Sequence, residues 1–117
     1  MSLYRKKTGN QGELDATVYL KGQGFSIIQK NYRTRFGEID IVAEKNKTLY
    51  FIEVKTRSND SKGKPYESIN FYKLTHLKRA SDMFLLQNNY KNYKLKLALI
   101  SILRDRGEIS FFDDLEI

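Results

Sequence analysis

The sequence contains no cysteine, no tryptophan and a single proline among its 117 residues. Without cysteine, disulfides and thiolate metal sites are excluded, and the composition fits a reducing, cytoplasmic location. Long apolar runs are also missing, since stretches such as residues 97–100 (LALI) are far too short to cross a bilayer. The opening residues (MSLYRKK) are charged and have no apolar run behind them, so neither a signal peptide nor a membrane association is expected.

Positive charge is what the sequence has in excess. Lysine and arginine number 21 against 14 acidic residues, which gives a formal net charge of +7 and a pI of about 9.6. The cations are spread along the chain, which favours a polyanionic partner such as nucleic acid, DNA in particular, because phosphate contacts release counterions. An ordinary basic surface that aids solubility is the alternative.

A single domain spanning residues 1–117 is expected, because no linker, repeat or low-complexity segment interrupts the chain. Hydrophobic periodicity predicts helices at 9–24 and 68–88 and strands at 25–32, 38–43, 48–56, 95–103 and 109–112. The order α-β-β-β-α-β-β indicates an α/β fold with a mixed sheet between helices.

The first predicted helix has an apolar face at Ala16 and Leu20, with Leu14 and Thr17 as further candidates. Gly12 near its start indicates either a close backbone approach or a frayed first turn.

Three charged residues stand out on the two central strands. Glu53 and Lys55 are two apart on a strand, so their side chains leave the same face. Asp40 lies on the preceding strand, across a short turn. If the two strands pair antiparallel, the two carboxylates come within reach of one ion, although the sequence does not fix the register.

Hard oxygen ligands of this kind suit Mg²⁺ or Mn²⁺, which can activate water and stabilise charge on a phosphate. A neighbouring lysine adds positive charge for the same chemistry. Taken alone, Glu-x-Lys is a weak signal in a lysine-rich chain. A surface strand pair with a cross-strand attraction of about 0.2–1 kcal/mol explains it equally well.

The combination Asp40…Glu53-Val54-Lys55 resembles the D…(D/E)-x-K signature of the PD-(D/E)XK nuclease superfamily. The chain as a whole more closely resembles the YraN family of bacterial proteins, over roughly residues 9–103. The matching segments are 9–13 (GNQGE), 24–25 (GF), 31–33 (NYR), 37–42 (GEIDIV) and 51–57 (FIEVKTR), with Ala16, Leu20, Lys73 and Ala80. Residues 96–98 (KLA) depart from the family's usual Arg-Phe-Asp.

The resemblance implies a restriction-endonuclease-like fold and a similarity to archaeal Holliday-junction resolvases. It also implies metal-dependent hydrolysis of phosphodiester bonds in DNA, including branched or structured DNA. Asp40 and Glu53 would be metal ligands, Lys55 the catalytic lysine and Glu13 an accessory acid. Glu38 matches the family motif without an assigned role. A homodimer would follow from the need for two symmetric cuts.

Several further residues are candidates for binding nucleic acid. The cations selected as candidate phosphate contacts are Arg33, Arg35, Arg57, Lys62, Lys64 and Lys73. Solvated charge is the alternative for each of them. His76 is expected to be a partly exposed helical residue rather than a catalytic base. Tyr66 and Tyr72 could stack on bases, but a place at the edge of the core is favoured.

Two functions besides a nuclease remain open at this stage. A nucleic-acid-binding module that kept the fold without cutting would bind in a salt-sensitive way and need no metal. An adaptor for an acidic protein would have no affinity for nucleic acid, and it leaves the charged end of strand 48–56 unexplained.

Overall fold

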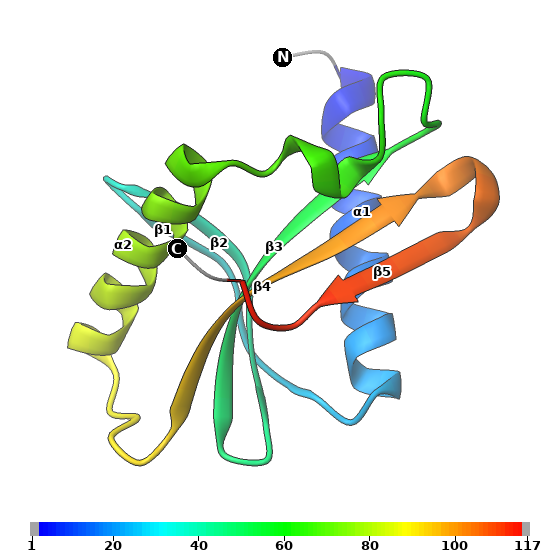
Figure 1. The fold of residues 1–117 in the computed structure, drawn as a ribbon. Helices are drawn as coiled ribbons and strands as arrows, with labels where there is room; N and C mark the ends of the chain where they lie inside the picture. The colour runs from blue at the N-terminus through cyan, green and yellow to red at the C-terminus, as the bar shows by residue number, and fades with distance from the viewer. Residues whose placement is uncertain (1–2, 116–117) are drawn as a thin grey trace.

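The computed structural model describes the backbone of residues 3–115 and the side chains of residues 10–115. The signal-peptide expectation rests on residues whose side chains lie outside this set. Along the chain run α1 (Leu3–Gly22), β1 (Ser26–Thr34), β2 (Gly37–Lys45), β3 (Thr48–Arg57), the 3-10 helix η1 (Pro65–Ser68), α2 (Phe71–Gln87), β4 (Lys94–Leu103), η2 (Arg104–Arg106) and β5 (Glu108–Phe112) (Figure 1). The predicted order is confirmed, although α1 begins earlier and α2 later than expected.

The five strands form one mixed sheet in the order β1-β2-β3-β4-β5. Strands β3 and β4 are parallel, and every other neighbouring pair is antiparallel. A parallel pair needs a crossover connection, which α2 supplies between β3 and β4. This architecture confirms the expected α/β class and is consistent with a nuclease-like fold.

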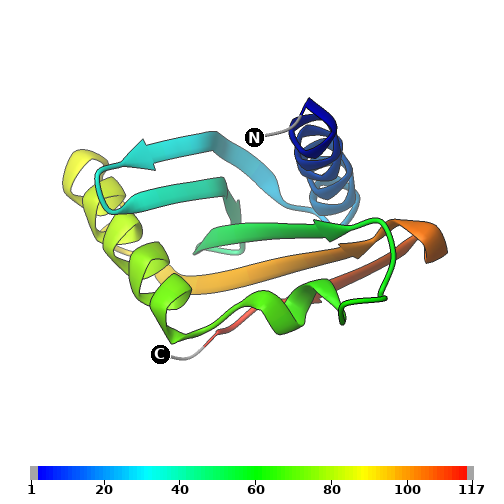
Figure 2. The ribbon, with the colours of Figure 1, turned by 90° about the horizontal axis from the view of Figure 1, so that it is seen from above.

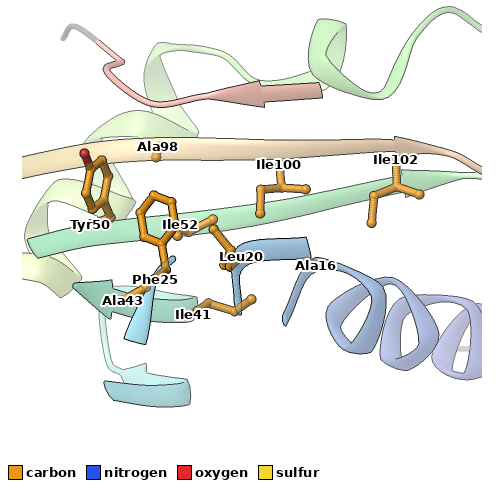
Figure 3. Close-up of a cluster of buried hydrophobic side chains, with 10 residues drawn as sticks. All are labelled: Ala16, Leu20, Phe25, Ile41, Ala43, Tyr50, Ile52, Ala98, Ile100 and Ile102. Atoms are coloured by element: carbon orange, nitrogen blue, oxygen red, sulfur yellow. The ribbon is translucent and has the colours of Figure 1, made fainter. Parts of the chain in front are cut away.

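The two helices cover opposite faces of the sheet (Figure 2). Under α1, Ala16 and Leu20 pack on Ile41, Ile52 and Ile100 (Figure 3). Under α2, a second buried cluster joins Val42, Leu49 and Phe51 to Leu77, Ala80 and Phe84. Alternation along β2 is interrupted, because Ile39 packs with Val42 on the side that α2 covers, whereas Ile41 and Ala43 pack under α1.

One expectation about α1 is wrong. Leu14 was a candidate for its buried face, but the side chain is 52% exposed. It lies on the side of the helix turned from the sheet, as does Val18, one turn further along. None of the described helices is long and apolar enough to span a membrane.

Gly12 marks the closest approach of α1 to the sheet, which confirms the first of the two interpretations of this glycine. A methyl group built on Gly12 would lie 2.1 Å from Oγ1 of Thr56 and 3.2 Å from its Cβ. Only glycine therefore lets the start of α1 rest on β3 at this position. The approach sets how near the following residue, Glu13, comes to the sheet.

We expect Gly12→Ala to lower the free energy of unfolding by about 1–3 kcal/mol, because the added methyl group overpacks a buried contact. This loss should exceed the gain of about 1 kcal/mol that alanine brings to a helix interior. Urea denaturation measures it. Gly22→Ala is the matched control, since nothing lies within 4 Å of a methyl group there and stability should be unchanged or raised. Equal stabilities of Gly12→Ala and the parent would contradict the close contact.

Candidate active site

The Asp40 carboxylate lies where β2 and β3 stop pairing. Their ladder pairs Ile41 with Ile52, and no paired residues follow beyond this point. Instead, the Val54 backbone N–H donates to Oδ2 of Asp40 at 2.7 Å. The side chain thus replaces a strand-to-strand hydrogen bond. Asp40 and Glu53 directly follow the last paired residues of this antiparallel ladder and line the same cavity, which brings the two carboxylates close together, as the nuclease hypothesis required.

These residues line a cavity of about 230 Å³ between the sheet and α2, here called the acid cavity. Its lining consists of Glu38, Asp40, Glu53, Lys55, Tyr72, Lys73, His76 and Leu77. Within it, Nζ of Lys55 lies 3.5 Å from Oε1 of Glu53, and both side chains are largely buried. The three residues of the signature therefore converge on one cavity.

The acid cavity is an unfavourable place for a carboxylate without a cation. Burial first, and repulsion from Glu53 second, raise the pKa of Asp40 to about 8. Glu13 and Glu38 raise this pKa further, while the hydrogen bond from Val54 opposes the shift. A bound cation would lower the pKa of Asp40, because its positive charge favours the ionised carboxylate.

A second pair of acids, Glu13 of α1 and Glu38 of β2, stands beside the first. With its amide nitrogen turned towards them, Asn31 donates to Oε1 of each at 2.9 Å. Burial and then Glu38 raise the pKa of Glu13. Asn31 is a functional candidate that the sequence analysis missed. Its left-handed φ of 54°, a conformation in which asparagine is enriched, could have been suspected but not located from the sequence.

Two lysines meet on the other side of the acid cavity. Lys55 and Lys73 both line this cavity, and the neighbouring Lys55, together with burial, lowers the pKa of Lys73. Glu53 opposes the shift, and Arg57 adds to it. Lys73 is thus brought to the site as expected, and the lysine pair supplies a place where a phosphate would relieve repulsion.

His76 joins α2 to the tip of the β1–β2 hairpin. Its Nδ1 makes a short contact with the Phe36 carbonyl, and its Cβ lies close to Gly37. The ring of Tyr72 packs on His76 with centroids 4.3 Å apart. His76 is half-buried, which agrees with its expected helical role. Tyr72 is 71% exposed, so its favoured place at the core edge is wrong.

The remaining candidate cations divide into two groups. Arg33 lies 3.7 Å from Glu38 and is highly exposed. Arg35, over the Phe36 ring, and Lys62, on the loop after β3, are exposed as well. Arg57 instead donates to the carbonyls of Lys62 and Gly63 and so holds this loop. Lys64 pairs with Asp60 and Glu108, away from the lining of the acid cavity. The structure therefore gives Arg57 and Lys64 roles inside the fold.

The side chains around the acid cavity can be compared with the ligands that a metal ion needs. Among the described side chains, no three His, Cys, Asp or Glu residues are grouped so that they could hold an ion by themselves. Mg²⁺, however, is commonly held by one or two carboxylates, with water and substrate phosphates completing its shell. Asp40 and Glu53, which follow the end of the ladder and line one cavity, fit that arrangement.

A larger cavity, of about 580 Å³, lies at the other end of α2. Its lining includes Leu85, Leu86, Tyr90, Lys91 and Tyr93, and it contains no carboxylate. It therefore offers amide oxygens but no anionic carboxylate for the expected metal chemistry, and the acid cavity is the candidate site.

Comparison with known proteins identifies the family. Residues 12–103 match the model of the family described as "Uncharacterised protein family UPF0102", the YraN family. The chain belongs to this family.

Relatives in the family cover most of the chain. A UPF0102 protein of Alkaliphilus oremlandii is 49% identical over 83 residues, 71% of each chain. One from Chlorobium limicola is 44% identical over 97 residues, 83% of this chain and 75% of its own. One from Clostridium acetobutylicum is 32% identical over 111 residues, 95% of this chain and 91% of its own.

The raised pKa of Asp40 has a consequence for stability without metal. Above its ordinary value of 3.8, the carboxyl of the unfolded chain ionises, whereas the folded protein keeps the proton up to about pH 8. The free energy of unfolding in EDTA should therefore fall as pH rises from about 4 to 8. The side chain of Asp40→Asn cannot ionise. Between pH 4 and 8, the free energy of unfolding of this variant should therefore rise by at least about 1.4 kcal/mol relative to that of the parent.

Urea denaturation at several pH values measures the difference. Asp82→Asn is the matched control, because Asp82 is exposed and its partner Lys78 lies on the same helix. Its stability should run parallel to the parent's. Parallel curves for Asp40→Asn as well would show that Asp40 is not held in a costly environment.

Proposed function

We propose that this protein is a metal-dependent endonuclease that hydrolyses phosphodiester bonds in DNA. The observation that carries the proposal is the convergence of Asp40, Glu53 and Lys55 on the acid cavity. Two carboxylates from neighbouring strands and an amine on the same face are the groups that phosphodiester hydrolysis needs. The net charge of +7 suits a polyanionic substrate.

Each residue has a distinct part in this proposal. Asp40 and Glu53 would hold Mg²⁺ or Mn²⁺, with Asp40 fixed in orientation by the Val54 N–H. Such a metal supplies an activated water and stabilises charge on the phosphate. Lys55, held beside Glu53, orients the attacked phosphate and adds positive charge.

The residues around this trio support it. Lys73 lies against Lys55 and gives the phosphate a second cation. Glu13 and Glu38, bridged by Asn31, add negative charge next to Asp40 and so strengthen the attraction for a cation. Arg33, beside Glu38, and the exposed Lys62 remain available for the backbone of the substrate further away.

Cleavage tests the proposal directly. A panel of linear, branched and single-stranded DNA and of RNA is incubated with Mg²⁺ or Mn²⁺. We expect DNA cleavage that stops in EDTA and falls at least about 100-fold in Asp40→Asn, Glu53→Gln and Lys55→Met, because each removes a group that stabilises the transition state. Asp82→Asn, an exposed acid on α2, should cleave like the parent.

Cleavage that survives both acid substitutions would place any activity elsewhere and contradict the proposal. Binding without cleavage of any substrate would favour the non-catalytic nucleic-acid-binding module instead.

Metal binding can be measured apart from catalysis. Calorimetric titration of the parent with Mn²⁺ should give a saturable signal, because Asp40 and Glu53 face one cavity. Asp40→Asn and Glu53→Gln should each weaken binding at least about 10-fold, since each removes one anionic ligand. Asp82→Asn should leave it unchanged. No heat with the parent would contradict a metal site at these residues.

A further inference from the structure

An exposed aromatic ring stands at the edge of the acid cavity. Tyr72, in the first turn of α2, lines this cavity together with Asp40, Glu53 and Lys55. Its residue surface is nevertheless 71% exposed, and its neighbour Phe71 is 69% exposed. Tyr72 and Phe71 together leave apolar ring surface at the edge of the acid cavity that is open to a ligand with a flat apolar face.

The Tyr72 ring packs against residues that are themselves held in place. The ring packs on His76, whose Nδ1 contacts the Phe36 carbonyl and whose Cβ lies against Gly37. The helix start is itself capped, since the Asn70 side chain accepts the Lys73 N–H at 2.9 Å. Tyr72 is thus presented from an anchored helix terminus.

Several cations lie near the Tyr72 and His76 rings. Arg35 and Arg79 both lie over the Phe36 ring, with guanidinium carbons 4.9 Å and 5.9 Å from its centroid. Neither arginine has an acidic partner within ion-pair distance among the residues the structure describes. Lys73 follows Tyr72 in the chain and points into the acid cavity. Aromatic rings interleaved with cations are the pattern of surfaces that hold unpaired nucleotides.

We propose that Tyr72 stacks on an unpaired base, so that the substrate class is nucleic acid with an unpaired nucleotide next to the phosphodiester in the acid cavity. In an intact duplex both faces of each base are covered by neighbours, so only single strands, flaps, bulges or junctions offer a free face. Arg35, Arg79 and Lys73 contact the flanking phosphates. The part of this inference that concerns cleavage rests on the proposed nuclease function, whereas the part that concerns binding does not.

The experiment measures binding by fluorescence anisotropy in EDTA, so that cleavage cannot change the probes. The probes are a labelled single-stranded DNA oligonucleotide and the blunt duplex of the same sequence. Tyr72→Ala should bind the single strand at least about fivefold more weakly than the parent, the lower end for losing one stacked base. Its affinity for the duplex and the salt dependence of its binding should not change, because no charge is removed.

Three matched variants complete the design. Tyr72→Phe keeps the ring and should bind the single strand within about twofold of the parent. Leu86→Ala changes a residue 81% exposed near the other end of α2 and should leave both affinities unchanged. Lys73→Ala should weaken the binding of both probes and reduce the salt dependence of that binding, since it removes a phosphate contact. Circular dichroism confirms that each variant is folded.

Unchanged binding of Tyr72→Ala to the single strand, or an equal loss for both probes, would overturn the inference. So would a parent protein that does not bind the single strand. These outcomes are separate from those of the cleavage assay. Metal-dependent cutting that needs Asp40 could persist while the stacking inference fails, and selective stacking could hold in a protein that cuts nothing.

Discussion

The whole site depends on one placement: a carboxylate inserted where two strands part. Asp40 accepts the Val54 N–H in place of the next ladder bond and lines the same cavity as Glu53. Burying an acid beside another acid is costly, which is why the pKa of Asp40 rises to about 8. The fold nevertheless places the carboxylates of Asp40 and Glu53 and the amine of Lys55 around one small cavity. The proposed chemistry follows from this crowding.

Both faces of the sheet contribute to that volume. From one side, the close contact of Gly12 with Thr56 brings Glu13 near enough to share Asn31 with Glu38. From the other side, α2 supplies Lys73 against Lys55 and an exposed ring at Tyr72. Helix α1 therefore adds an acid beside Asp40, and α2 adds a cation beside Lys55. This separation of charge suits a cation and a phosphate bound side by side.

The sequence predicted most of the scaffold, because strand alternation and helical periodicity are local signals. It also predicted that Asp40, Glu53 and Lys55 would converge, provided that the strands paired antiparallel, and they do. The bridge by Asn31 was missed because it joins residues far apart in the chain. Lys64 and Asp60, and Arg57 and Lys62, are close in the chain, but their contacts depend on the conformation of the loop after β3, which the sequence does not fix. The exposure of Tyr72 was also missed, because tyrosine occurs both at core edges and on surfaces and the pattern does not separate the two.

The central claim is that the space between Asp40 and Glu53 binds a divalent cation. A crystal grown or soaked with Mn²⁺ tests it, since anomalous scattering locates the metal without assumptions about its ligands. The expected result is one strong peak within about 2.0–2.6 Å of a carboxylate oxygen from each residue, absent from crystals of Asp40→Asn. No peak in the acid cavity, or a peak held only by other residues, would contradict the account.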